Sequence, residues 1–219
     1  MKKRLIIVGG KGSGQIAMSV FEDVNKIKET WKIEGYLNDI VKAGDYFGRY
    51  KILGRSEEVA DFARKGYYVH YALHVNARDK YERVMKFQSY DIPLEANASA
   101  IHPTAYINPD TEIGYGVVIF PYVVTSFGPT IGNFVHVYSS ALIGHDSTIG
   151  DYCTVAAHAA VGARINVQEG AHVGLNSCIR EDISIGKYSI IGMGSVVIKD
   201  TEDFSIVAGN PAKPIGRVK

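Results

Sequence analysis

The chain has 219 residues, a length that allows one or two domains with a hydrophobic core. Its 24 Lys and Arg residues nearly balance its 23 Asp and Glu residues. This balance argues against a surface for nucleic acid or acidic membranes, which would show a clustered excess of basic charge. We expect a cytoplasmic protein without membrane insertion, because the first apolar run, residues 5–8, is too short for a signal peptide or a spanning helix.

Strand and helix patterns alternate through residues 1–92. Strands are predicted at residues 4–8, 33–37, 52–54 and 67–73, and helices from the glycine-rich segment to about residue 29, at 56–65 and at 76–88. Such alternation is typical of a small parallel sheet. We therefore expect a Rossmann-like α/β domain, which a short connector at residues 93–99 joins to the rest of the chain.

The glycine-rich segment, residues 9–14, follows the first predicted strand, where doubly wound sheets bind nucleotides. The dinucleotide pattern GxGxxG fails, because Gln15 stands where the third glycine would fall, so a hydride-transfer cofactor is not expected. Asn38 and Asp39 end the second predicted strand and are candidates to hold a ribose hydroxyl or a base edge. The alternative is that both are turn residues without a ligand.

An aliphatic residue returns at every sixth position from residue 101 to residue 197, and Thr125 is the single exception to Ile or Val. Glycine often follows the aliphatic residue, as at Gly144 and Gly174, which suits a corner where a side chain would clash or where φ is positive. This period is the hexapeptide signature of a parallel β-helix. We expect residues 101–198 to form an all-β, left-handed parallel β-helix, with residues 199–219 as a C-terminal tail.

The two cysteines, Cys153 and Cys178, form neither a disulfide framework nor a CxxC site. Small residues precede many aliphatic positions of the repeat, which fits a tight interior. We expect both cysteines to be packing residues rather than nucleophiles.

His145 and Asp146 occupy hexad positions whose side chains point outward. A histidine steadied by a neighbouring carboxylate is a suitable general base near neutral pH. Transfer of an acyl group to an amine needs such a base, while backbone N–H groups stabilise the oxyanion. The alternative is a surface histidine with a chance neighbour.

Three segments resemble the sugar acyltransferases of the sialic acid O-acetyltransferase and bacillosamine N-acetyltransferase type. They are the glycine-rich start, residues 142–150 (LIGHDSTIG) and residues 207–215 (VAGNPAKPI). The resemblance covers essentially the whole chain in the same domain order. It implies a homotrimer that uses acetyl-CoA as co-substrate, without a metal, to acetylate a nucleotide-linked amino sugar for surface glycan or O-antigen precursors.

The resemblance also assigns roles to residues. His145 matches the general base and Asp146 the acidic residue that orients it, while residues 1–92 would bind the nucleotide sugar. The positions that match the acetyl-CoA site are Gly174, Leu175, Gly192, Met193, Gly209, Asn210, Pro211, Ala212 and Lys213. The positions that match the nucleotide-sugar site are Gly12, Ser13, Gly14 and Asp39.

Three positions depart from the family pattern and leave the acceptor open. Ser13 and Thr154 stand where many relatives have histidines, and Tyr138, in the substrate region, replaces a frequent asparagine. His158 is a candidate substitute for the histidine missing at Thr154. The base itself is intact, so either an amine of a UDP- or dTDP-linked sugar or a hydroxyl of a sialic-type sugar could be the nucleophile.

Two further classes stay open. A zinc enzyme of the γ-carbonic-anhydrase kind needs three converging histidines, and the outward candidates are His136, His145, His158 and His172, none of them spaced as a local metal pair. A non-catalytic scaffold could use aromatic residues of the early coils, which we expect instead to pack against the N-terminal domain or a neighbouring subunit: Tyr106, Tyr115, Phe120, Tyr122 and Phe127. His102 and His136 are expected to be solvated or to lie at a trimer interface.

Overall fold

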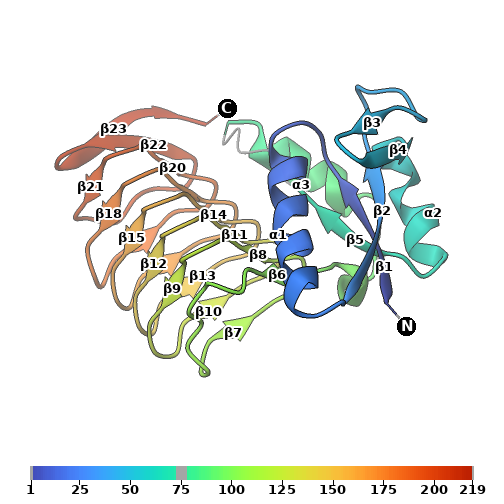
Figure 1. Ribbon diagram of the computed structural model, residues 1–219. Coiled ribbons are helices and arrows are strands. Elements are labelled where there is room, and N and C mark those ends of the chain that lie inside the picture. The colour runs from blue at the N-terminus through green and yellow to red at the C-terminus, as the bar shows by residue number, and fades with distance from the viewer. Residues whose placement is uncertain (1, 73–77, 219) are drawn as a thin grey trace.

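The computed structural model describes residues 2–72 and 78–218, which form an N-terminal α/β part and a long stack of β-coils (Figure 1). The N-terminal sheet has the strand order β3-β4-β2-β1-β5. Its strands are β1 (Lys3–Val8), β2 (Trp31–Leu37), β3 (Tyr46–Phe47), β4 (Tyr50–Gly54) and β5 (Tyr68–Tyr71). All neighbours run parallel except β3, which pairs antiparallel with β4. The parallel sheet predicted from the alternating pattern is therefore present.

The connecting elements also match the prediction closely. They are α1 (Ser13–Ile27), η1 (Ser56–Glu58), α2 (Val59–Arg64), α3 (Lys80–Gln88) and η2 (Leu94–Ala96). The predicted strand end at residue 73 and the predicted helix start at residues 76–77 lie outside the described residues. The short strand β3 was not predicted, because two residues are too few to show a period of two.

Residues from Ala100 onward form three stacked sheets, which fit the predicted left-handed β-helix. The covered face, next to the N-terminal part, consists of β6 (Ala100–Ile101), β8 (Val118–Ile119), β11 (His136–Val137), β14 (Thr154–Val155), β17 (His172–Val173), β20 (Ile190–Ile191), β22 (Ser205–Gly209) and β23 (Ala212–Arg217). Its strands are parallel up to β22, and β23 folds back antiparallel on β22. The last hairpin therefore extends the β-helix.

The other two faces have five strands each within the described residues. The open face consists of β9 (Val124–Thr125), β12 (Leu142–Ile143), β15 (Ala160–Val161), β18 (Cys178–Ile179) and β21 (Val196–Val197). The polar face consists of β7 (Glu112–Ile113), β10 (Thr130–Ile131), β13 (Thr148–Ile149), β16 (Asn166–Val167) and β19 (Ser184–Ile185). The second residue of each strand points inward, into one continuous core of Ile and Val side chains.

Thr125, the exception in the hexad pattern, also points into this core and is fully buried. Its hydroxyl is satisfied there, because it lies 2.9 Å from Thr111 Oγ1 and accepts a hydrogen bond from Asn108 N at 2.9 Å. A buried hydroxyl with partners costs little, so the coil tolerates the substitution.

Glycine is required after the aliphatic residues because the backbone of the next coil lies too close for a side chain, and not because φ is positive there. A Cβ at Gly144 would collide with the carbonyl oxygen of Gly162 in the next coil. The left-handed backbone lies two residues later, for example at Asp146 with φ 56°. Of the two reasons expected for these glycines, the structure therefore supports the steric one.

The junction between the two parts is built on buried histidines. His70 on β5 stacks on His136 of the covered face, with ring centroids 5.4 Å apart. His102 Nε2 lies 3.2 Å from Asp23 Oδ2 on α1. The expectation that His102 and His136 are solvated or lie between subunits was therefore wrong, since both pack against the N-terminal part of the same chain.

A buried lysine also joins the two parts. Lys80, the first residue of α3, donates from Nζ to Thr154 Oγ1 at 2.9 Å and to Tyr152 O at 3.2 Å. Burial lowers the pKa of Lys80 to about 8. Thr154, which stands where relatives have a histidine, thus serves here as a contact to α3.

The early-coil aromatics divide into two groups. Phe120 is buried against the N-terminal part and stacks on Tyr138 at 4.5 Å, as expected. The others are exposed on this chain: Tyr106, Tyr115, Tyr122 and Phe127. The cysteines also differ, because Cys153 is buried in the core, whereas Cys178 is exposed on the open face and is not a packing residue within this chain.

The buried histidines predict an acid-sensitive junction. Burial lowers the pKa of His70 to about 4 and, with Lys80 as a lesser cause, that of His172 to about 3. In the unfolded chain these histidines become protonated near pH 6.5. The free energy of unfolding is therefore highest above that pH and decreases as the pH falls below it. We expect a loss of about 2 kcal/mol per histidine at pH 5.

Urea unfolding at pH 7, 6 and 5 measures this slope. His70→Gln should flatten it, whereas His158→Gln, at an exposed position, should leave it unchanged. A slope that is equal in all three proteins would contradict the assignment.

Candidate active site

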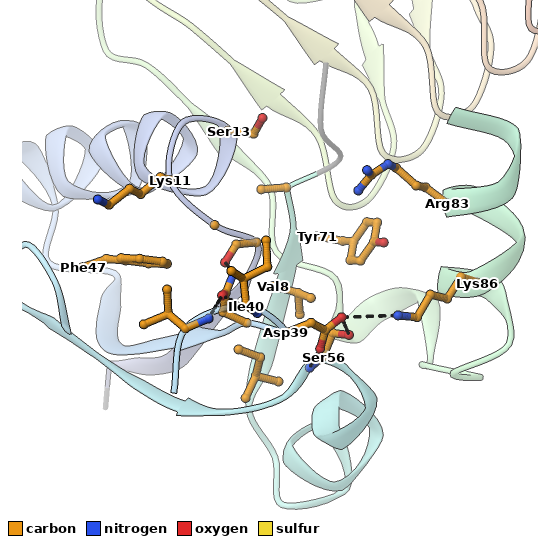
Figure 2. A pocket seen from close by; sticks show the side chains of 16 residues that line it. Val8, Lys11, Ser13, Asp39, Ile40, Phe47, Ser56, Tyr71, Arg83 and Lys86 are labelled. Carbon is orange, nitrogen blue, oxygen red and sulfur yellow. Dashed lines mark hydrogen bonds and ion pairs between the residues drawn. The ribbon is translucent and has the colours of Figure 1, made fainter. Parts of the chain in front are cut away.

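A pocket of about 670 Å³ opens at the ends of β1, β2 and β5 (Figure 2). The glycine-rich segment and the start of α1 form one wall, and residues 37–41 form the second. The third wall comes from α3, which contributes Arg83 and Lys86. The pocket therefore lies at the carboxyl ends of parallel strands, where open α/β sheets bind ligands.

The end of β2 is fixed by Asn38. Its Oδ1 accepts hydrogen bonds from Ile40 N at 3.0 Å and Val41 N at 2.7 Å, and its Nδ2 donates to Gly9 O at 3.0 Å. The side chain is buried, and these three bonds all go to backbone groups. Asn38 thus shapes the pocket wall by tying two loops together, which corresponds to the turn role considered as the alternative.

Asp39 is likewise engaged by protein groups. Its carboxylate accepts from Ser56 N at 2.9 Å and from Ser56 Oγ at 2.6 Å, and it pairs with Lys86 Nζ at 3.3 Å. Burial would raise the pKa of Asp39, but the bonds from Ser56 and Lys86 outweigh it and the pKa is lowered. The carboxylate is held charged at the pocket floor, so any contact to a ribose must share these bonds.

Among the described residues that line the pocket, three are cationic and one is anionic: Lys11, Arg83, Lys86 and Asp39. Figure 2 shows Arg83 and Lys86 reaching from α3 toward Tyr71 and Asp39. Neither Arg83 nor Lys86 was found from the sequence, because both belong to a helix more than forty residues downstream of Asp39. The spacing of three residues between them on α3 gives no signal of a ligand.

The predicted glycine positions fall into different places. Ser13 lines the pocket and begins α1, whereas Gly12 and Gly14 are not among the lining residues. Gly12 has a left-handed φ of 87°, and Gly14 is buried where a Cβ would press on Gly9. These glycines let the loop turn tightly, so that the first N–H groups of α1 face the pocket mouth.

His145 and Asp146 lie at the corner between the open and polar faces, just after β12. His145 Nδ1 lies 2.8 Å from Asp146 Oδ2, and both side chains are about half exposed. His145 Nε2 faces Arg164 Nη1 at 3.5 Å. The structure therefore brings the predicted base and its carboxylate together, but neither is among the residues that line the pocket.

The residues assigned to acetyl-CoA lie at the far end of the coil stack. Leu175 and Met193 stand one coil apart and expose 49% and 77% of their surface. Gly209 and Ala212 pair across the turn of the β22–β23 hairpin, which holds Asn210 and Pro211, and Lys213 is exposed beside it. Exposed apolar side chains beside an open hairpin suit the amphipathic arm of a coenzyme thioester, so these residues fit such a ligand.

The other candidate positions contact the protein itself. Tyr138 is largely buried against Phe120, and burial raises its pKa to about 12. His158 is exposed at a corner of the coil, whereas His136 is buried and His172 mostly so. Within residues 2–72 and 78–218 no cluster of three His, Cys, Asp or Glu side chains could hold a metal ion.

Comparisons with known proteins agree with the repeat. Residues 128–163 match the family model described as bacterial transferase hexapeptide (six repeats). The match shows that this segment contains hexapeptide repeats of the kind that the model describes. A search of curated proteins found no match. No helix in the described part of the chain is long and apolar enough to cross a membrane.

Three solved structures share the fold over nearly the whole chain. The acetyltransferase domain of PglB from Neisseria gonorrhoeae has a TM-score of 0.84 at 22% identity, covering 98% of this chain and 100% of that one. PerB from Caulobacter crescentus, in complex with CoA and GDP-perosamine, has a TM-score of 0.82 at 22% identity, covering 97% of each chain. WeeI from Acinetobacter baumannii has a TM-score of 0.80 at 24% identity, covering 98% and 100%. At these identities the likeness establishes a common fold.

The geometry of Asn38 makes a prediction about the pocket wall. Asn38→Ala removes three hydrogen bonds, one to Gly9 O in the glycine-rich segment and two from Ile40 N and Val41 N in the loop after β2. We expect the free energy of unfolding to fall by about 2–4 kcal/mol, since buried backbone groups lose partners. Urea denaturation measures the change, with Lys42→Ala, an exposed neighbour, as the control. Equal stability of the two variants would contradict the structural role of Asn38.

Proposed function

We propose that this protein is an acetyl-CoA-dependent N-acetyltransferase that acts on a nucleotide-linked amino sugar. The observation that carries the proposal is the exposed His145–Asp146 pair on a hexapeptide β-helix, joined in one chain to a pocket lined by cations. The reaction would supply acetylated sugars for surface glycans such as O-antigen. Solved structures of the same fold include the gonococcal domain in complex with acetyl coenzyme A and the Caulobacter protein with CoA and GDP-perosamine.

The pocket suits the nucleotide. A nucleoside diphosphate carries negative charge, and Lys11, Arg83 and Lys86 outnumber the single carboxylate of Asp39. The N-terminus of α1 adds partial positive charge at the same mouth. In this proposal residues 1–92 act as a Rossmann-like nucleotide domain, and Ser13, which lines the pocket, contacts the nucleotide-linked sugar.

His145 suits the chemistry. Nδ1 is engaged with Asp146, so Nε2 is the nitrogen that takes a proton from the attacking amine as the tetrahedral intermediate forms. Asp146 holds the ring and stabilises the positive charge that it gains. Backbone N–H groups near the corner stabilise the oxyanion. Transfer is direct, with amine and thioester bound together.

In this proposal the active site is complete only when several copies of the chain assemble. The outward residues of the open face are mainly apolar, whereas those of the polar face are hydrophilic, and the N-terminal part covers the remaining face. Val124 and Leu142 expose 40% and 42% of their surface, and no described part of this chain covers them. We propose that the open face packs against neighbouring copies in a homotrimer. The corner with His145 then meets the pocket and hairpin of a neighbouring copy.

The first test is a thiol-release assay with acetyl-CoA and UDP-, dTDP- and GDP-linked amino sugars, with sialic acid beside them. We expect release with an amino sugar, and His145→Gln should lower kcat by about 10²–10⁴-fold because the base is lost. Acetyl-CoA affinity should be nearly unchanged. His158→Gln, an exposed histidine on another corner, is the matched control.

Full activity of His145→Gln would sink the mechanism. Release with sialic acid alone would reassign the reaction to O-acetylation at the same base. Failure both to bind acetyl-CoA and to release thiol would favour a scaffold.

The second test concerns the cations of α3. Arg83→Met and Lys86→Met should each raise the KM for the nucleotide sugar by about tenfold, since each removes a charge-assisted contact to phosphate. The KM for acetyl-CoA should stay constant. Arg64→Met removes a cation from α2, outside the pocket lining, and should change neither constant. A tenfold effect in that control would show that overall charge, not the pocket, attracts the substrate.

A further inference from the structure

The side of His145 that faces away from Asp146 meets a second charged group. Arg164 Nη1 lies 3.5 Å from His145 Nε2, opposite the 2.8 Å contact between Nδ1 and Asp146 Oδ2. A guanidinium is always protonated and only donates hydrogen bonds. The nitrogen that faces it must therefore present its lone pair, which leaves the ring proton on Nδ1, where Asp146 accepts it.

The coil geometry fixes Arg164 in this place. Asp146, Arg164 and Asp182 occupy the same corner in successive coils, with φ of 56°, 56° and 60°. Arg164 N donates to His145 O at 2.9 Å, as part of the ladder between coils. Arg164 therefore stands one coil along from Asp146, and its side chain reaches His145 Nε2 from there.

Asp182 fixes the direction of the guanidinium. Its Oδ1 accepts from Arg164 Nε at 2.6 Å and its Oδ2 accepts from Arg164 Nη2 at 2.7 Å. This two-pronged contact holds the plane of the guanidinium and leaves Nη1 as the group that points to His145. The pKa of Asp182 is lowered, chiefly by its hydrogen bonds with Arg164.

We propose that Arg164, held by Asp182, is a positioning residue that keeps His145 in the tautomer with the proton on Nδ1 and the lone pair on Nε2. The catalytic part of this inference rests on the proposed function, whereas the tautomer does not. Arg164 also acts after proton transfer, because a proton on Nε2 would lie beside a fixed positive charge. The imidazolium is thereby made less favourable, and the base returns to its neutral form.

The charges around the ring give the sign of the effect. Asp146 and Asp182 are the nearby carboxylates, Arg164 is the cation in contact, and Arg180 and Glu181 belong to the next coil. Removal of Arg164 leaves the carboxylates in place, so the charged ring becomes more favourable.

Nitrogen NMR of protein labelled at histidine tests the tautomer without any substrate. The His145 signals are assigned by their loss in His145→Gln. We expect protonated Nδ1 in the wild type and a raised midpoint in Arg164→Met. Arg180→Met is the matched control, because it removes a cation from the same region without contact to His145, and its midpoint should move much less. A wild-type ring protonated on Nε2, or equal shifts in both variants, would overturn the proposal.

The pH profile of kcat/KM tests the catalytic consequence. In Arg164→Met the acidic limb should move to higher pH because the cation beside Nε2 is lost, and Arg164→Lys, which keeps the charge but cannot make the two-pronged contact to Asp182, should move it less. If the acidic limb of the pH profile stays in place in Arg164→Met while the NMR midpoint moves, Arg164 has no role in the reaction. Absence of turnover in the wild type would instead refute the proposed function and leave the NMR result standing.

Discussion

The structure depends on the closure of one coil every eighteen residues. Pairs such as Thr130 with Thr148 and His136 with Thr154 lie opposite each other in neighbouring strands, so residues eighteen apart stack in columns. Each hexad contributes one inward branched side chain, and the coil closes only if that side chain fits the triangular interior. Core, faces and corners are all columns in this sense, and a residue's role follows from the column to which it belongs.

The columns explain how one repetitive sequence makes three different surfaces. On the covered face the outward residues Val118, His136 and Thr154 are buried under α1, α3 and β5. The open face keeps apolar residues in the same position, and the polar face keeps hydrophilic ones. The burial of neutral histidines and of Lys80 at the junction stabilises a specific docking of the two parts, while it leaves ionisable groups where charge is unfavourable.

The two halves of the candidate site are distant in sequence and are built from different kinds of structure. The pocket is a product of loops at the end of a parallel sheet, where Asn38 and Asp39 are already engaged by backbone and by Ser56. His145 stands on the corner of a rigid stack, where its neighbours are set by the coil repeat. A rigid corner suits the proposed role of this imidazole as a base, and a loop-built pocket suits the proposed selection of a nucleotide-linked sugar.

The sequence alone was enough to predict the β-helix from its six-residue period and the alternation of strands and helices in the N-terminal part. It also placed His145 beside Asp146, since neighbouring residues at a corner remain neighbours in space. The three-dimensional packing was needed to show that His102 and His136 face the N-terminal part, that Cys178 lies on the surface, and that Arg83 and Lys86 reach the pocket. It was also needed to show that Arg164, held by Asp182, contacts His145. These facts depend on how elements dock and on which way a side chain turns, and local periodicity carries no information about either.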